Sequence, residues 1–129
     1  MKSLSLVNAG ATLLAALVPT LAMAEGLDGR RFEGVFIERG KTSGDADTLV
    51  FKDGRFHSTA CDQYGYSDAP YKTVTAGDTV RFEAETVSAK YGKLLWAGAI
   101  RGGKLDATVM MERKGKSPLE NWVVAAEKN

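Results

Sequence analysis

Apolar and polar side chains alternate along most of the chain after residue 25, which is the pattern of β-strands that bury one face. The clearest case is the run 79–88, where Val80 and Phe82 share one face while Arg81 and Glu83 share the other. The same alternation predicts eight strands in all, over residues 29–38, 47–53, 55–61, 69–75, 79–88, 93–101, 104–113 and 119–127.

Short turns separate the predicted strands. Asp53-Gly54 is typical of a two-residue hairpin turn that needs positive φ, and Gly102-Gly103 predicts another. Links this short favour antiparallel pairing between consecutive strands, because a parallel pair needs a long crossover. The sequence therefore predicts an all-β fold, a single eight-stranded antiparallel up-and-down (meander) barrel, since closure pairs the two edges that an open meander exposes.

Two other architectures share this pattern. A two-sheet sandwich is the main alternative, since it also uses short one-sided strands. An outer-membrane barrel is excluded, because the face that carries Arg81, Glu83 and Glu85 cannot lie against lipid.

One face of each strand supplies the predicted core. In the last strand either Trp122 and Val124 or Val123 and Ala125 point inward, and the alternation leaves both assignments open. Tryptophans in such a small domain are expected in the core, which applies to Trp96 and to Trp122. The inward positions elsewhere are Phe32, Gly34, Phe36, Leu49, Phe51, Phe56, Val80, Phe82, Ala84, Thr86, Leu94, Trp96, Gly98, Ile100, Leu105, Ala107, Val109 and Met111.

The first 24 residues are typical of a secretory signal peptide. Lys2 is followed by a mostly apolar segment, then by Pro19 and the small-residue ending Ala22-Met23-Ala24. Cleavage before Glu25 leaves one domain, residues 25–129, and predicts a periplasmic or secreted protein of the bacterial envelope. An N-terminal membrane anchor is the alternative, but Asn8 and Thr12 interrupt the apolar segment. No stable membrane span is expected after cleavage.

Composition and charge exclude several classes of protein. Apolar residues make up 44% and charged residues 26% of the 129, which is globular rather than disordered composition. The net charge is +1 and the longest basic run is Arg30-Arg31, so no nucleic-acid binding is expected. The one cysteine, Cys61, excludes an internal disulfide.

Two resemblances follow from these observations. The small exported eight-stranded meander resembles the lipocalin and calycin group, although its first strand begins Gly29-Arg30-Arg31-Phe32 instead of Gly-x-Trp. Residues 48–64, with a strand, a turn glycine, a second strand and then Ala60-Cys61-Asp62, resemble META-type envelope domains. Both resemblances imply a β-domain of the envelope, lipocalin-like by the first of them, and neither implies a particular function.

Cys61 is predicted at the end of the third strand. It is expected to be a small buried hydrophobic residue, with a reactive thiol or a Cys61-linked dimer as the alternatives. His57 lies on the same face of that strand, but a spacing of four residues puts it roughly 13 Å away, too far for a nucleophilic pair. The same spacing argues against a shared metal site.

The remaining titratable residues suggest no catalytic site. Asp45 and Asp47 are interpreted as part of a solvated loop, and Glu83 and Glu85 as an outer polar stripe. Motifs for phosphate, dinucleotide or nucleophilic-serine chemistry are absent from the sequence. No catalytic residue, metal or cofactor is therefore predicted, and the protein is expected not to be an enzyme.

Small barrels often bind ligands at the mouth or inside. The favoured function is a non-catalytic binding module for a small apolar or amphipathic ligand at the barrel mouth. The candidate ligand-binding residues are Cys61, Gln63, Tyr64, Tyr66, Tyr71 and Trp96. The alternative is an envelope protein-interaction or inhibitor domain that acts through the loop 62–71, whose Tyr, Ser, Gly and Asp residues are typical of contact surfaces.

Overall fold

Eight antiparallel strands close into a barrel in which each strand pairs with its neighbours in chain order, and β8 pairs back with β1. The computed structural model describes residues 26–129, so the predicted signal peptide lies outside the described residues. Within that range no helix is long and apolar enough to cross a bilayer. The elements are β1 (Arg31–Ile37), β2 (Asp45–Lys52), β3 (Arg55–Ser58), the 3₁₀ helix η1 (Thr59–Tyr64), β4 (Ala69–Ala76), β5 (Thr79–Ser88), β6 (Gly92–Arg101), β7 (Lys104–Arg113) and β8 (Lys116–Lys128).

The structure confirms the predicted all-β, up-and-down barrel, and it follows the turn chemistry of the sequence. Asp53 and Gly54 both adopt positive φ, at 53° and 76°, as the predicted hairpin turn between β2 and β3 requires. The β6–β7 turn uses Gly102 and Gly103 in the same way.

The prediction for the third strand is wrong at its end. β3 stops at Ser58, and Cys61 lies in η1 instead of in a strand. The helix ends at Gly65, whose φ of 82° is left-handed, and the Gly65 N–H donates to the Asp62 carbonyl. The apolar residues at positions 60 and 61 hid this change of structure, because η1 also buries Cys61.

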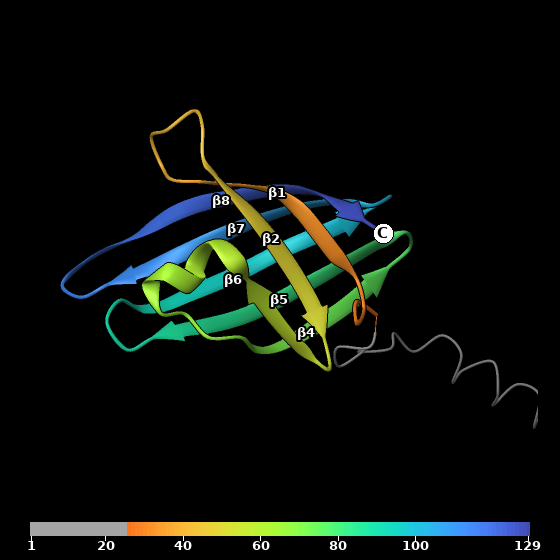
Figure 1. Ribbon diagram of the computed structural model, residues 1–129, viewed down its shortest axis with the longest axis horizontal. Coiled ribbons are helices and arrows are strands. Elements are labelled where there is room, and N and C mark those ends of the chain that lie inside the picture. Colours follow the sequence, from red (N-terminus) through yellow and green to blue (C-terminus); the bar gives the residue numbers. More distant parts are fainter. Residues whose placement is uncertain (1–25) are drawn as a thin grey trace, which may run out of the picture.

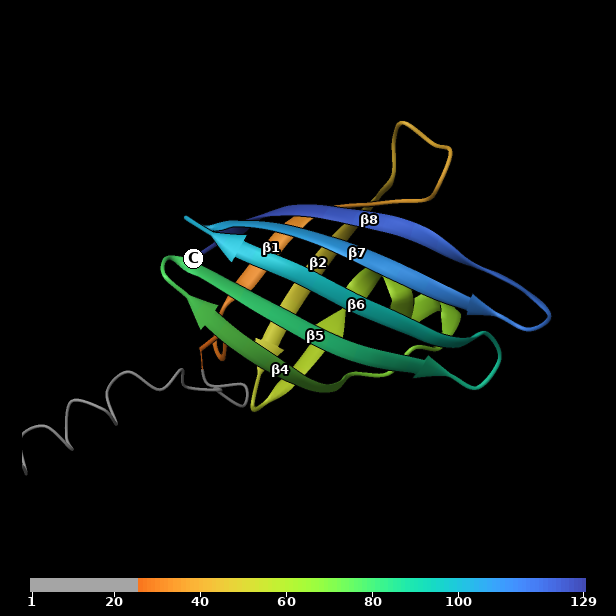
Figure 2. The ribbon, with the colours of Figure 1, turned by 180° about the vertical axis from the view of Figure 1, so that it is seen from behind.

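The barrel is flattened, with two walls of unequal length. The long strands β5–β8 form one wall, and β1 and β2 cross it at a steep angle on the opposite side (Figures 1 and 2). β1 closes the ring on β8 from Arg31 opposite Lys128 to Ile37 opposite Trp122. The pairing between β3 and β4 is the shortest in the ring, because it consists of Arg55 opposite Pro70 and Phe56 opposite Ala69.

Aromatic side chains fill the centre of the barrel. Phe51 packs against Phe82 with ring centroids 5.0 Å apart, and Phe56 lies 4.8 Å from Trp96. Trp96 is 1% exposed, and its indole N–H donates to the Thr86 hydroxyl at 3.1 Å. A ligand buried at the level of these rings would have to displace them, so space for a ligand is confined to the ends.

The predicted inward faces of β5, β6 and β7 are confirmed. In β8, Val123 is buried and Ala125 packs against the core, while Trp122 and Val124 are exposed. The expectation that Trp122 belongs to the core is therefore wrong, because its neighbours Asn121 and Val123 occupy the inward positions of this strand.

The end of the barrel at which the described chain begins is closed by residues that precede β1. Leu27 is fully buried there. Asp28 accepts hydrogen bonds from the Gly54 N–H at 3.0 Å and from the Tyr71 hydroxyl at 2.5 Å. These contacts tie the first turn of the described chain to the β2–β3 turn and leave the opposite end as the candidate mouth.

Candidate binding site at the barrel mouth

η1 and the β5–β6 and β7–β8 turns lie at the same end of the barrel (Figure 1). A pocket of about 290 Å³ opens at this end. Its walls come from β1 and β2, from η1 and Tyr66 beyond it, from the β5–β6 turn, and from β6, β7 and β8. The lining residues are Phe36, Glu38, Asp45, Ala60, Cys61, Tyr64, Tyr66, Tyr91, Leu94, Met111, Leu119 and Asn121. Most of this surface is apolar or aromatic, as in small-molecule sites generally.

Ser88 fixes the position of the aromatic residues at the rim. Its buried hydroxyl donates to the Tyr64 carbonyl at 2.7 Å and accepts hydrogen bonds from the Lys90 and Tyr91 N–H groups at 3.2 Å. The Tyr64 and Tyr91 rings meet edge to face with centroids 5.8 Å apart. One buried side chain thus joins the end of η1 to the β5–β6 turn.

The Tyr66 hydroxyl is the one buried side-chain nitrogen or oxygen atom in residues 26–129 that has no hydrogen-bond partner. Tyr66 is 6% exposed and lines the pocket. Burial raises the pKa of this phenol, and the Cys61 thiol and the Tyr91 phenol raise it further, so the group is neutral at pH 7. A neutral phenol can donate one hydrogen bond and accept others, so this hydroxyl is available to a ligand group that reaches it.

The mouth brings together some of the residues predicted from the sequence and separates others. Cys61, Tyr64 and Tyr66 line the pocket. Gln63 is exposed and is not part of the lining. Tyr71 lies near the closed end, where its ring packs against Phe51 and its hydroxyl donates a hydrogen bond to Asp28. Trp96 lies in the core, where its ring is 6.0 Å from the lining residue Phe36.

The sequence pattern did not indicate several lining residues, although the topology implies them. In an up-and-down barrel, alternate connections meet at the same end, so the links β1–β2, β3–β4, β5–β6 and β7–β8 share the mouth. Tyr91 lies in the third of these links, and Glu38 lies in the first. Neither topology nor alternation indicated Asn121, because an amide within a strand usually points outward. In the structure its side chain is buried, accepts a hydrogen bond from the Arg39 N–H and donates one to the Val109 carbonyl.

A buried polar network supports the floor of the pocket. The Ser58 hydroxyl donates to the Asp47 carboxylate at 2.8 Å and lies 3.4 Å from Cys61 Sγ, and the Ala60 N–H donates to the same carboxylate at 3.0 Å. The interpretation of Asp47 as a solvated loop residue is therefore wrong. Asp47 lies in β2 in the same alternation as the inward residues Leu49 and Phe51, and that alternation was the available signal.

Asp47 gives a first testable prediction, which concerns the pH dependence of stability. Burial raises its pKa above the ordinary 3.8, although bonds from Ala60 and Ser58 oppose the rise. The folded chain then holds this proton more tightly than the unfolded chain. The stability that this residue contributes is present below pH 3.8 and is lost as pH rises through the raised pKa.

The measurement compares wild type with Asp47→Asn by urea unfolding at several pH values. The free energy of unfolding of wild type should fall relative to that of the variant as the pH rises from 3 to 7. If the free energy of unfolding of wild type instead rises relative to that of the variant, the hydrogen bonds from Ser58 and Ala60 lower the pKa of Asp47 more than burial raises it.

His57 and Cys61 do not form a pair in the structure. His57 Nε2 lies 2.9 Å from Asp62 Oδ1, on a partly exposed surface. Burial raises the pKa of the Cys61 thiol to about 11, and the Asp47 and Asp62 carboxylates add to the rise, while the Ser58 hydrogen bond opposes it. The thiol is thus protonated and buried at neutral pH, which is the opposite of an activated nucleophile.

A second prediction follows for the reactivity of Cys61. At pH 7.5 the native thiol should react with iodoacetamide about 100-fold more slowly than Cys61 in the urea-unfolded chain, because two pKa units reduce the thiolate fraction about 100-fold. Mass spectrometry of quenched samples measures both rates. Equal rates would mean that the thiol is exposed and ionisable. A Cys61-linked dimer would need the same exposure, and it stays a prediction.

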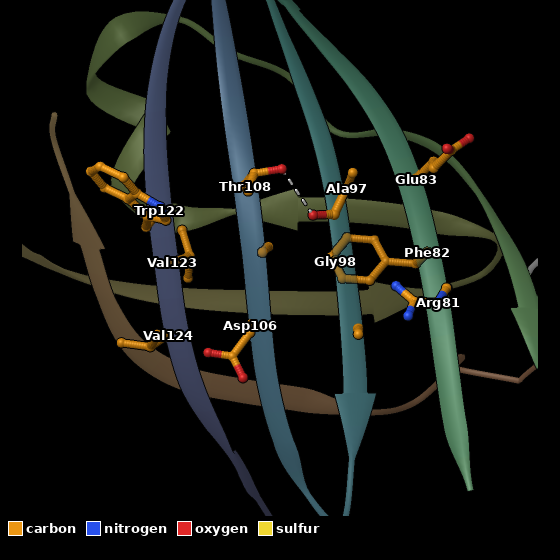
Figure 3. Close-up of a pocket in the computed structure, with 12 residues that line it drawn as sticks. Arg81, Phe82, Glu83, Ala97, Gly98, Asp106, Thr108, Trp122, Val123 and Val124 are labelled. Atoms are coloured by element: carbon orange, nitrogen blue, oxygen red, sulfur yellow. Dashed lines mark hydrogen bonds between the residues drawn. The ribbon is translucent and has the colours of Figure 1, made fainter. Parts of the chain in front are cut away.

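A shallower groove of about 430 Å³ lies on the outer face of β5–β8 (Figure 3). Trp122 and Val124 border it on β8, and Arg81 and Glu83 border it on β5, while Ala97 and neighbouring small residues form its base. Beneath it, a Cβ on Gly98 would lie 2.5 Å from the Phe82 ring, so the glycine allows the core ring to pack. The groove holds no buried polar atom without a partner, which makes the mouth the stronger candidate.

Comparisons with protein-family models, with curated proteins and with solved structures find no significant match for this chain. The resemblances to lipocalins and to META-type domains therefore stay predictions. In the part of the chain from residue 26 onward, no group of three or more His, Cys, Asp and Glu side chains is placed to hold a metal ion.

Proposed function

We propose that the mature chain is a non-catalytic binding module that holds a small apolar or amphipathic ligand in the pocket at the barrel mouth. The pocket volume of about 290 Å³ suits a ligand of some ten to twenty non-hydrogen atoms. Its lining is mainly aromatic and aliphatic, so burial of an apolar body would drive binding. The closed opposite end and the aromatic core restrict the ligand to the mouth.

One observation carries this proposal, the unpartnered hydroxyl of Tyr66 in the wall of an apolar pocket. A buried hydroxyl without a hydrogen bond costs about 1–3 kcal/mol of stability. Phenylalanine would avoid this cost with nearly the same shape. A phenol that is retained at a cost to the empty protein is typical of a group that acts on a ligand.

The main experiment uses the neutral fluorophore N-phenyl-1-naphthylamine and its displacement by 1-octanol. Wild type is expected to enhance the fluorescence saturably, and 1-octanol is expected to reverse the effect. Leu119→Trp, which fills the pocket, should abolish binding. The matched variant Leu95→Trp lies on the outer face and should bind as wild type does. Equal binding by both variants would place the fluorophore elsewhere and contradict the proposal.

Tyr66→Phe gives the third prediction. Removal of the unpartnered hydroxyl should raise the free energy of unfolding of the empty protein by about 1 kcal/mol. It should also weaken 1-octanol binding about fivefold, because the hydrogen bond to the ligand is lost. Urea unfolding and fluorophore displacement measure the two effects. A less stable variant would mean that the hydroxyl has a structural partner, and the carrying observation would fail.

The alternative function, an envelope protein-interaction or inhibitor domain acting through residues 62–71, has a smaller surface than the sequence suggests. Tyr66 and Tyr71 are buried, so Tyr64 is the exposed aromatic residue of this segment, at 43% exposure. A pulldown from envelope extract with wild type and Tyr64→Ser tests it. Loss of a captured protein with unchanged fluorophore binding would favour this alternative.

Export to the periplasm or the medium is part of the proposal. It is supported by the charge, the apolar segment and the Ala22-Met23-Ala24 ending of the first 24 residues. Intact mass measurement of the protein from its own host would test it, because cleavage leaves Glu25 as the first residue.

A further inference from the structure

We infer that the ligand of the mouth pocket is an organic cation, an amphipathic amine whose apolar body enters the barrel while its charged head lies at the rim. This inference rests on the proposed binding function and specifies the chemical class of the ligand.

The charges of the pocket lining have one sign. Glu38 and Asp45 are the two ionisable lining residues with carboxylates, and the lining contains no lysine, arginine or histidine. Glu38 has a partner, Lys41, at 3.4 Å in an exposed pair, whereas Asp45 has no ion pair among the described residues. An anionic ligand would meet these carboxylates without a compensating positive group, and a cationic ligand would complete the pair that Asp45 lacks.

Two further carboxylates add to this negative field from behind the pocket wall. Asp47 and Asp62 both act electrostatically on the Cys61 thiol, which is part of the lining. The lysines near the rim are already engaged, because Lys41 contacts Glu38 and Lys90 Nζ lies over the Tyr91 ring.

Aromatic faces at the rim provide the second recognition element. Tyr64 and Tyr91 are about half-exposed and meet edge to face, with Phe36 and Tyr66 in the same lining. Ring faces attract cations within about 6 Å of the centroid. The Tyr91 ring already has a cation at this distance, because Lys90 Nζ lies 5.2 Å from its centroid. Ser88 bonds the backbone of both rim tyrosines, and their rings also contact each other.

The Tyr66 hydroxyl is an observation independent of these charges. It is buried in the pocket wall and has no partner, so it points to a ligand with a hydrogen-bonding group. An alkylammonium head offers three N–H donors, which the phenol oxygen and a carboxylate can both accept. The combination of carboxylates, ring faces and a free phenol oxygen suits an amine better than an acid or an alcohol.

The experiment compares three ligands of eight carbons each with different heads, octylammonium, 1-octanol and octanoate, in displacement of N-phenyl-1-naphthylamine at pH 7. Octylammonium should bind about tenfold more tightly than 1-octanol, and octanoate should bind most weakly. The preference for octylammonium should shrink as salt is raised from 20 mM to 500 mM, because the rim carboxylates are exposed and therefore screened.

Paired variants assign the preference to the rim. Glu38→Gln with Asp45→Asn should reduce the preference for octylammonium over 1-octanol to about twofold, with both ligands compared through the fluorophore affinity measured for the same variant. The control Asp53→Asn with Asp78→Asn removes the same charge from turns at the opposite end of the barrel, and it should keep the wild-type preference.

The outcomes separate this inference from the function on which it rests. If the three ligands displace the fluorophore equally, or if octanoate is preferred, the inference is wrong and the binding function stands. If the fluorophore does not bind, the proposed function fails and the inference fails with it. If the preference survives in the Glu38/Asp45 variant, these carboxylates are not its source, and the assignment is overturned.

Discussion

Trp96→Ala is expected to lower the free energy of unfolding by about 3–5 kcal/mol. The indole is almost completely buried, and it packs against Phe56 at 4.8 Å and Phe36 at 6.0 Å. Its loss also leaves the buried Thr86 hydroxyl without its donor. A domain of this size has a total stability of about 5–15 kcal/mol, so the variant should unfold at a much lower urea concentration in far-UV circular dichroism.

The second tryptophan provides the matched control. Trp122 is 37% exposed on the outer face of β8, and Trp122→Ala should cost less than about 1 kcal/mol. Should Trp96→Ala fail to fold, Trp96→Phe keeps an aromatic ring at the site and extends the comparison. Similar losses for Trp96→Ala and Trp122→Ala would contradict the inward and outward assignments of these strands.

Gly34→Ala should lower the free energy of unfolding by about 3 kcal/mol. A Cβ at this position would lie 1.9 Å from the Val124 carbonyl oxygen and 2.5 Å from the Ala125 Cα, and both atoms belong to the backbone of β8. Backbone atoms cannot rotate away as a side chain can. The added methyl group must therefore push β1 away from β8 at the pairing that closes the barrel.

Gly26→Ala is the control for this prediction. The nearest atom to its added Cβ is the Thr73 hydroxyl at 4.0 Å, so the change should stay within about 0.5 kcal/mol. Thermal and urea unfolding of both variants measure the difference. If Gly34→Ala is as stable as Gly26→Ala, β1 does not approach β8 as closely as described.

The sequence predicts the barrel well because each strand obeys one simple rule. In β5 the apolar Val80, Phe82 and Ala84 alternate with charged residues, and turn residues with positive φ, such as Gly102, mark where the chain reverses. The rule fails in β8, where Trp122, Val123 and Val124 are all apolar and alternation cannot separate the faces. It also fails after Ser58, because a 3₁₀ helix that buries Cys61 has an apolar content similar to that of a strand.

The candidate site was predictable in part, from which connections share an end of the barrel. The aromatic residues that follow β3 indicated the mouth, and Cys61, Tyr64 and Tyr66 do line the pocket. Tyr71 is only five residues beyond Tyr66, but its side chain turns towards Asp28 at the closed end. Side-chain direction depends on the register between β3 and β4, and the pattern of one strand does not determine that register.

The short β3–β4 pairing bears on strand addition between copies of the chain. It is the place where the hydrogen-bonded ring can separate at the lowest cost, and separation would turn β3 and β4 into two free edges. Free edges invite strand addition from another copy of the chain. Pro70, opposite Arg55, has no N–H to offer such a strand, and Arg55 is charged. Arg55 and Pro70 therefore disfavour strand addition at the shortest pairing of the barrel.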